Sequence, residues 1–212
     1  MLIRLSLLIA ISSALLACGS AKEPQTYAPL FEDGFRTNLA GGSWWSPCFQ
    51  VMGIGGTILK RRIQFFKDLT YITTTSYYED SCKMPQYVIT EKGTYFLPFT
   101  SDEAKPIDLT MNEVLISPRK GYVNEAFNKS AFCGITEWKI NKDHPVTGLN
   151  CSGTTYPAAG TTTYDLFLVT TNPTPGFSYG QLRFGDTSGA NNGTTSVLRP
   201  VDIETDGFYY TK

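Results

Sequence analysis

Hydrophobic and polar residues alternate with a period of two over much of the chain after residue 35. The clearest runs are IQFFK at 63–67, GTYFLPF at 93–99, GITEWKI at 134–140, YDLFLVT at 164–170, YGQLRF at 179–184 and FYYT at 208–211. This period is typical of β-strands that bury one face. Weaker alternation at 71–78 and 107–116, together with the segment around residue 44, brings the expected number of strands to eight or nine.

Turn-forming dipeptides separate these runs, including Glu79-Asp80, Asn172-Pro173 and Asn192-Gly193. Such residues preset φ or tolerate a positive φ, so they favour short connections between neighbouring strands. The sequence therefore predicts an all-β fold, an antiparallel up-and-down barrel of eight or nine strands, because closure removes the exposed edges of the sheet. The alternative is a two-sheet sandwich. One short helix is expected, over residues 122–132.

The N-terminal segment differs from the rest. Residues 1–4 carry a positive charge, residues 5–16 are apolar, and LLACGS follows at 15–20. The apolar run is shorter than the roughly 20 residues of a spanning helix and is typical of a signal peptide. The motif closely resembles a bacterial lipobox, which implies that Cys18 is acylated and becomes the new N-terminus. If the cell is Gram-negative, the sorting rule of that family makes Gly19 after the cysteine an outer-membrane signal, with the domain in the periplasm or at the cell surface.

The expected organisation is thus a lipoprotein signal peptide at 1–17, a lipidated cysteine with a flexible tether at 18–34, and a single barrel domain at 35–212. Residues 19–34 are polar with two prolines and have no clear period, which is typical of a tether.

Lipidation of Cys18 leaves four of the five cysteines: Cys48, Cys82, Cys133 and Cys151. An oxidising envelope compartment favours disulfides, and four cysteines permit three pairings. Pairing of neighbours, Cys48 with Cys82 and Cys133 with Cys151, closes the shortest loops and is the prediction. A four-cysteine zinc site is the rival, and no CxxC spacing favours it.

Composition narrows the classes of partner. The chain has 212 residues, 13% aromatic residues and a formal net charge of −1. Such a charge does not favour nucleic acid as a partner. Neither a cofactor nor a metal ion is expected. The expected partners are a membrane, through the lipid anchor, and either a hydrophobic small molecule or a protein.

The segment Gly42-Ser43-Trp44 resembles the G-x-W signature of the lipocalin group, some of whose members are outer-membrane lipoproteins. The resemblance covers residues 35–212 and implies an eight-stranded barrel whose closed end is plugged by Trp44. It also implies that a late arginine, Arg183 or Arg199, lies across the indole as a cation–π contact. The family's T-D-Y turn is absent.

A barrel of this size encloses packed side chains or one small ligand. Alternating aromatic residues are the candidate cavity lining: Tyr71, Tyr95, Phe99, Trp138, Phe167 and Tyr179. The expected function is therefore the binding of a small hydrophobic or amphipathic ligand.

No catalytic residues are predicted, and the protein is expected not to be an enzyme. The single histidine, His144, lies in a turn-like segment, and no G-x-S-x-G elbow is present. The alternative function is a structural or protein-interaction lipoprotein with a filled barrel. Within that alternative, SGTTY at 152–156 resembles the exposed loop of lysozyme-inhibitor lipoproteins.

Overall fold

The computed structural model describes residues 39–40, 42–50, 57–100, 102–171, 180–205 and 210–211. The predicted signal peptide at 1–17, Cys18 with its tether at 18–34, and Tyr179 lie outside the described residues.

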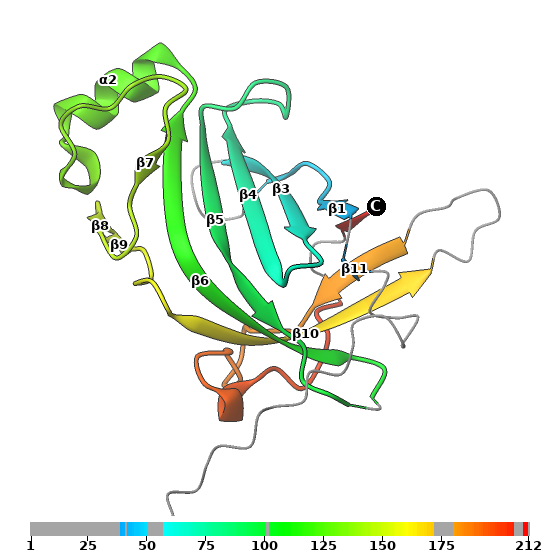
Figure 1. The fold of residues 1–212 in the computed structure, drawn as a ribbon. Coiled ribbons are helices and arrows are strands. Elements are labelled where there is room, and N and C mark those ends of the chain that lie inside the picture. Colours follow the sequence, from blue (N-terminus) through cyan, green and yellow to red (C-terminus); the bar gives the residue numbers. More distant parts are fainter. Residues whose placement is uncertain are drawn as a thin grey trace, which may run out of the picture.

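Eight strands among the described residues pair in chain order to form a nearly closed antiparallel barrel (Figure 1). Strand β1 pairs with β3 on one side and β12 on the other, which joins the two ends of the meander. The β1–β12 contact is the single pair Trp45 with Thr211. The eight strands are β1 (Gly42–Trp45), β3 (Ile58–Phe65), β4 (Thr70–Tyr78), β5 (Tyr87–Phe96), β6 (Lys105–Pro118), β10 (Thr162–Thr171), β11 (Gly180–Phe184) and β12 (Tyr210–Thr211). The prediction of an all-β up-and-down barrel is confirmed.

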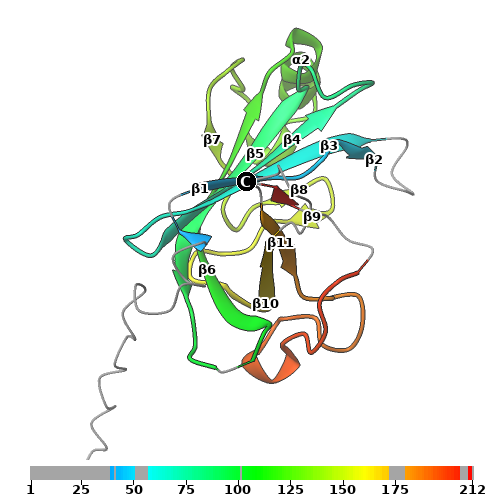
Figure 2. The same cartoon turned by 90° about the vertical axis from the view of Figure 1, so that its right-hand side faces the viewer.

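Short elements decorate the barrel. Strand β2 (Phe49–Gln50) pairs with the start of β3, and β7 (His144–Pro145) pairs with the end of β6. Strands β8 (Asn150–Cys151) and β9 (Thr154–Thr155) form a separate hairpin. The helical elements are α2 (Gly121–Lys129) and the 3₁₀ turns η1 (Phe132–Gly134) and η2 (Ser196–Leu198). In the views of Figures 1 and 2, α2 and the segment that carries η2 lie at opposite ends of the molecule.

The predicted helix exists over residues 121–129, but the predicted strand at 134–140 does not. The side chain of Asn128 accepts a hydrogen bond from the backbone N–H of Trp138 at 2.6 Å and donates one to its carbonyl at 3.1 Å. These are the backbone groups that a neighbouring strand would bind. The alternating residues of GITEWKI therefore pack beneath the helix, and the segment does not pair with a strand of the sheet.

A bulge curves the longest strand, β6. The pairing of β5 with β6 runs from Lys92–Glu113 to Gly93–Met111, so Asn112 is an extra residue on β6. Bulges bend a strand and increase its twist. The curvature of β6 in Figure 1 brings its first half beside β10 and its second half beside β7.

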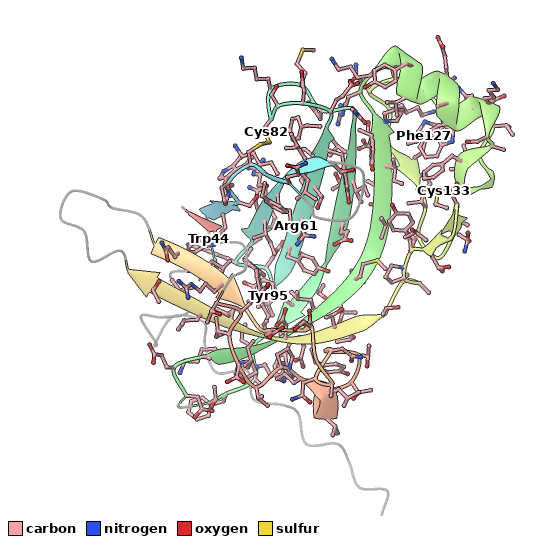
Figure 3. The ribbon with its side chains drawn as sticks, turned by 180° about the vertical axis from the view of Figure 1, so that it is seen from behind. Trp44, Arg61, Cys82, Tyr95, Phe127 and Cys133 are labelled. Carbon is pink, nitrogen blue, oxygen red and sulfur yellow. A yellow bond between two sulfur atoms is a disulfide. The ribbon has the colours of Figure 1, made fainter. Side chains whose placement is uncertain are left out.

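Two apolar clusters fill the concave side of the sheet. The first apolar cluster consists of Leu39, Trp44, Ile63, Phe65, Tyr71, Tyr95, Leu97, Ile107, Phe167, Val169 and Leu182. The second apolar cluster joins Ile89, Met111, Val114 and Ile116 of the sheet to Cys133, Trp138, Val146 and Cys151 of the segment after β6. That segment, with α2, therefore covers one half of the inner face, as the labelled Phe127 and Cys133 show in Figure 3.

Both predicted disulfides are present. Cys48 bonds to Cys82 and ties the β1–β2 segment to the connection after β4, while Cys133 bonds to Cys151 within the covering segment. The cysteine pairing predicted from loop length is confirmed.

Candidate binding cavity in the barrel

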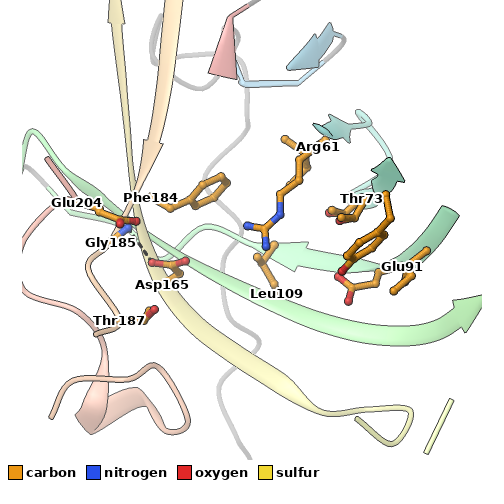
Figure 4. Close-up of a pocket in the computed structure, with 13 residues that line it drawn as sticks. Arg61, Thr73, Glu91, Leu109, Asp165, Phe184, Gly185, Thr187 and Glu204 are labelled. Atoms are coloured by element: carbon orange, nitrogen blue, oxygen red, sulfur yellow. Dashed lines mark hydrogen bonds between the residues drawn. The ribbon is translucent and has the colours of Figure 1, made fainter. Parts of the chain in front are cut away.

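A cavity of about 360 Å³ lies inside the barrel, between the two apolar clusters (Figure 4). Ile63, Leu109 and Phe184 border it from the side of the first apolar cluster. Ile89 and Tyr77 border it from the side of the second. The remaining lining residues are polar, charged or glycine: Arg61, Thr73, Thr75, Glu91, Asp165, Gly185, Thr187 and Glu204.

The register of the strands explains why these residues meet. Arg61 of β3 pairs with Thr75 of β4, which pairs with Ile89 of β5. In the adjacent inward row, Ile63 pairs with Thr73 and Thr73 pairs with Glu91. Residues two apart on a strand share a face, so two rows of inward side chains form this wall of the cavity.

Charge is distributed unevenly in this cavity. Figure 4 shows the guanidinium of Arg61 extending between Glu91 on one side and Asp165 on the other. Burial raises the pKa of Glu91, and the positive charge of Arg61 opposes that rise. The lining therefore combines one guanidinium with the carboxylates of Glu91, Asp165 and Glu204.

Asp165 is the most strongly perturbed carboxyl group of the lining. Its pKa is raised from 3.8 to about 6, mainly by burial and in smaller part by the nearby Glu204, against two backbone hydrogen bonds and the charge of Arg199, which lower it. One carboxylate oxygen, Oδ1, accepts the backbone N–H of Leu166 at 2.7 Å and that of Gly185 at 3.0 Å. Those bonds fix the side chain at the end of β11.

Arg199 does not lie across Trp44, contrary to the expectation from the lipocalin resemblance. Its guanidinium forms an ion pair with Asp108 at 2.5 Å and donates to the carbonyls of Ile107 and Asp165. It also lies 5.5 Å from the ring of Tyr164. Arg199 therefore bonds to both β6 and β10, and it holds these two paired strands together from the outer face of the sheet. For Arg183, the contact with Trp44 stays a prediction.

Trp44 is buried in the first apolar cluster, with 1% of its surface exposed, and its Nε1 donates to the carbonyl of Leu39 at 3.2 Å. The neighbouring Trp45 points outward, where Lys60 and Arg62 lie over its ring. The two adjacent indoles therefore point to opposite faces of the strand.

Of the six aromatic residues predicted as lining, Tyr179 lies outside the described residues, and none of the other five borders the cavity. Tyr71, Tyr95 and Phe167 pack in the first apolar cluster, and the hydroxyl of Tyr95 donates to the carbonyl of Phe66. Trp138 belongs to the second apolar cluster, and Phe99 is 83% exposed. The aromatic rings that do border the cavity are Tyr77 and Phe184, which the sequence reasoning missed.

His144 has a structural environment. Its Nε2 accepts the backbone N–H of Lys139 at 3.1 Å, and its ring packs 4.6 Å from that of Trp138. Burial lowers its pKa, and the charge of Lys142 lowers it further. A neutral imidazole that accepts a backbone hydrogen bond helps to position the covering segment.

The Ser152–Tyr156 loop lies at the β8–β9 hairpin. Ser152, Gly153, Thr154 and Thr155 are exposed, while Tyr156 packs against the second apolar cluster. The disulfide at Cys151 joins the base of this hairpin to η1.

Neither a family model nor a curated protein matches the sequence. Within the described part of the chain, no three His, Cys, Asp or Glu side chains are grouped so that they could hold a metal ion. No helix in the same ranges is both long and apolar enough to cross a membrane.

Proposed function

We propose that this chain is a non-enzymatic binding protein that holds a small amphipathic ligand inside its barrel and is attached to a membrane of the cell envelope by lipid on Cys18. The observation that carries the proposal is the cavity of about 360 Å³ between the two apolar clusters. Binding sites for small molecules are typically concave, have volumes of about 300–1,000 Å³ and place a few polar groups on an apolar wall.

The lining favours an amphipathic ligand over a purely hydrophobic one. Ile63, Ile89, Leu109 and Phe184 provide apolar surface. The hydroxyl and charged groups of the same lining would lose their hydration beside a hydrocarbon without gaining hydrogen bonds, which is unfavourable. A ligand with both an apolar part and a polar group can contact the apolar side chains of the lining and form hydrogen bonds with its polar groups.

Native mass spectrometry of the protein extracted from its own membrane tests ligand binding. We expect a non-covalent adduct in the wild type and its loss in Thr75→Trp, because Thr75 points into the cavity between Arg61 and Ile89. Thr74→Trp is the matched control, since Thr74 is the next residue on β4 and points to the other face. An empty wild-type protein that also takes up no fluorescent amphipathic probe, whether anionic, neutral or cationic, would overturn the proposal.

The membrane attachment has its own test. Cys18→Ser removes the only sulfur that the lipobox resemblance assigns to acylation, so the protein should appear in the soluble envelope fraction. One acyl chain binds a membrane marginally and two or more hold it stably, so the change should be nearly complete. Retention of Cys18→Ser in the membrane fraction contradicts the anchor.

A second candidate function is the binding of a lysozyme-like enzyme by the β8–β9 hairpin. The observation that favours it is the exposure of Ser152 to Thr155 on a hairpin whose base is held by a disulfide. A rigid loop loses little conformational entropy when a protein partner binds it. Unchanged lysozyme activity in an excess of the purified protein would exclude this function.

A further inference from the structure

We propose that the barrel cavity selects a small organic cation, an amine that carries an apolar group, over neutral and anionic molecules of the same size. The inference rests on the proposed function, because it assigns a chemical class to the ligand of the same cavity.

The first step is the charge of the cavity lining, which is open to solvent on the side of the exposed Glu204. Among the described lining residues, the carboxyl groups of Glu91, Asp165 and Glu204 outnumber the one guanidinium, that of Arg61. Walls of low dielectric around an excess of one sign of charge raise the local concentration of the opposite ion. The cavity therefore attracts cations and repels anions.

The second step is that two of these carboxylates have oxygen atoms that accept no hydrogen bond from the described protein groups. Among the described residues Glu91 accepts no hydrogen bond, although it is mostly buried. Asp165 receives both of its backbone hydrogen bonds on Oδ1. Its side chain has a long-range attraction to Arg199, whose hydrogen bonds go to Asp108 and to backbone carbonyls. Oδ2 of Asp165 is thus left to face the cavity side.

The third step places the ammonium group. Asp165 and Glu204 interact with each other through their charges and lie on the same side of the cavity (Figure 4). Phe184 lies beside them. An ammonium between these two carboxylates gains charge-assisted hydrogen bonds, while the nearby Phe184 adds apolar surface for the rest of the ligand. Arg61 repels the same ammonium, so the charged end is directed to the Asp165 side and away from the cavity centre.

The rest of the ligand then lies along β3 to β6. The apolar side chains of Ile63 and Leu109 meet its hydrocarbon, and the hydroxyls of Thr73 and Thr75 bind any polar substituent. A primary amine with one aromatic or short aliphatic group has this distribution of charge and apolar surface.

The test compares three probes of nearly equal size by isothermal titration calorimetry: 2-phenylethylamine, 2-phenylethanol and 3-phenylpropanoate. We expect the amine to bind about tenfold or more tightly than the alcohol, since a hydrogen bond to a charged group contributes that much. We expect the propanoate to bind most weakly. Asp165→Asn and Glu204→Gln should each weaken the amine by about tenfold and leave the alcohol nearly unchanged.

The control for these variants is Glu113→Gln. Glu113 pairs with Lys92 on the outer side of the β5–β6 pair, with nearly half of its side chain exposed, so its substitution should change none of the three affinities. Thr75→Trp should abolish binding of the amine, which shows that the site is the cavity.

The outcomes separate the two proposals. If the alcohol or the propanoate binds as tightly as the amine and Thr75→Trp abolishes that binding, the cation inference is wrong and the proposed function stands. If Asp165→Asn and Glu204→Gln both leave the amine affinity unchanged, the assignment of the ammonium position is wrong. If no probe binds and no native adduct is found, both proposals are wrong.

Discussion

Replacement of Asp165 by asparagine should stabilise the barrel at neutral and alkaline pH. The wild-type carboxyl group has a pKa of about 6 in the folded protein against 3.8 when unperturbed. Between these pH values the folded state binds a proton that the unfolded state has lost, so stability decreases as the pH rises. Above about pH 6 the folded protein holds a buried ionised carboxylate at the full cost in free energy.

The magnitude follows from the two pKa values. They differ by about two units, and each unit corresponds to about 1.4 kcal/mol, so the ionised carboxylate destabilises the fold by roughly 3 kcal/mol at pH 8. The side-chain oxygen of asparagine can still accept the N–H groups of Leu166 and Gly185. Asp165→Asn should therefore gain most of that 3 kcal/mol, which corresponds to a rise in Tm of roughly 6–12 °C for a domain of this size.

Urea denaturation, followed by tryptophan fluorescence with both disulfides intact, measures the difference at pH 8 and at pH 4. The variant should be more stable at pH 8, and the difference should nearly vanish at pH 4, where the wild-type carboxyl is protonated in the folded state. The charges that act on Asp165 are those of Arg199, which lowers its pKa, and of Glu204, which raises it, and both residues are unchanged in the variant.

Asp68→Asn is a control of opposite sign. Hydrogen bonds from Thr70 lower the pKa of Asp68, which is exposed. The stabilisation from this carboxylate is present above its ordinary pKa and is lost as the pH falls, so the variant should be less stable at pH 8. An Asp165→Asn protein that is equally or less stable than the wild type at pH 8, or whose advantage persists at pH 4, refutes the reasoning.

Two further predictions concern the frame around the cavity. Gly93→Ala should destabilise the domain by about 2 kcal/mol or more in urea denaturation, because the added methyl group overlaps the carbonyl oxygen of Thr110 at the bulge. Gly121→Ala is the matched control, since nothing lies within 4 Å of its added methyl group, and it should be neutral or slightly stabilising; equal losses for both glycines contradict the steric argument. The double substitution Cys133→Ser with Cys151→Ser should lower the free energy of unfolding by about 3 kcal/mol, as expected for a closed loop of 18 residues. A loss well below 1 kcal/mol would show that the covering segment holds its place without the disulfide.

Much of the barrel was predictable because its strands bury one face. The alternation at 63–67 and 164–170, and the described part of the run at 179–184, lie in β3, β10 and β11 or at their ends. The run at 134–140 alternates equally well and forms no strand. Periodicity measures which side of a segment is buried, and a segment that covers a sheet can bury alternate residues while its backbone binds a side chain such as Asn128.

The cavity was harder to predict than the barrel. Sequence reasoning chose aromatic residues, and four of the six, Tyr71, Tyr95, Trp138 and Phe167, belong to the apolar clusters, because large rings pack best where no space is left. A charged residue that shares a strand face with buried residues was the signal that could have been used. Arg61 shares its face of the strand with Ile63 and Phe65, and Glu91 shares its face with Ile89. The contact between Asp165 and Arg199 was harder to predict from the sequence. It depends on the path of the connection between residues 185 and 205, which has no hydrophobic periodicity.

The position of the carboxylates is itself an argument about function. We expect a neutral side chain of similar shape at residue 165 to give a more stable barrel, and the partly buried Glu91, whose pKa burial also raises, is unfavourable for the same reason. Ionisable groups kept where they destabilise the fold are typical of functional sites, where a ligand supplies the missing charge. The two apolar clusters already close the barrel on either side of the cavity, so packing does not require charge between them. A cation bound there would recover the free energy that the ionised carboxylates lose, and its binding should strengthen as the pH rises through about 6, because Asp165 then loses the proton with which the ligand competes.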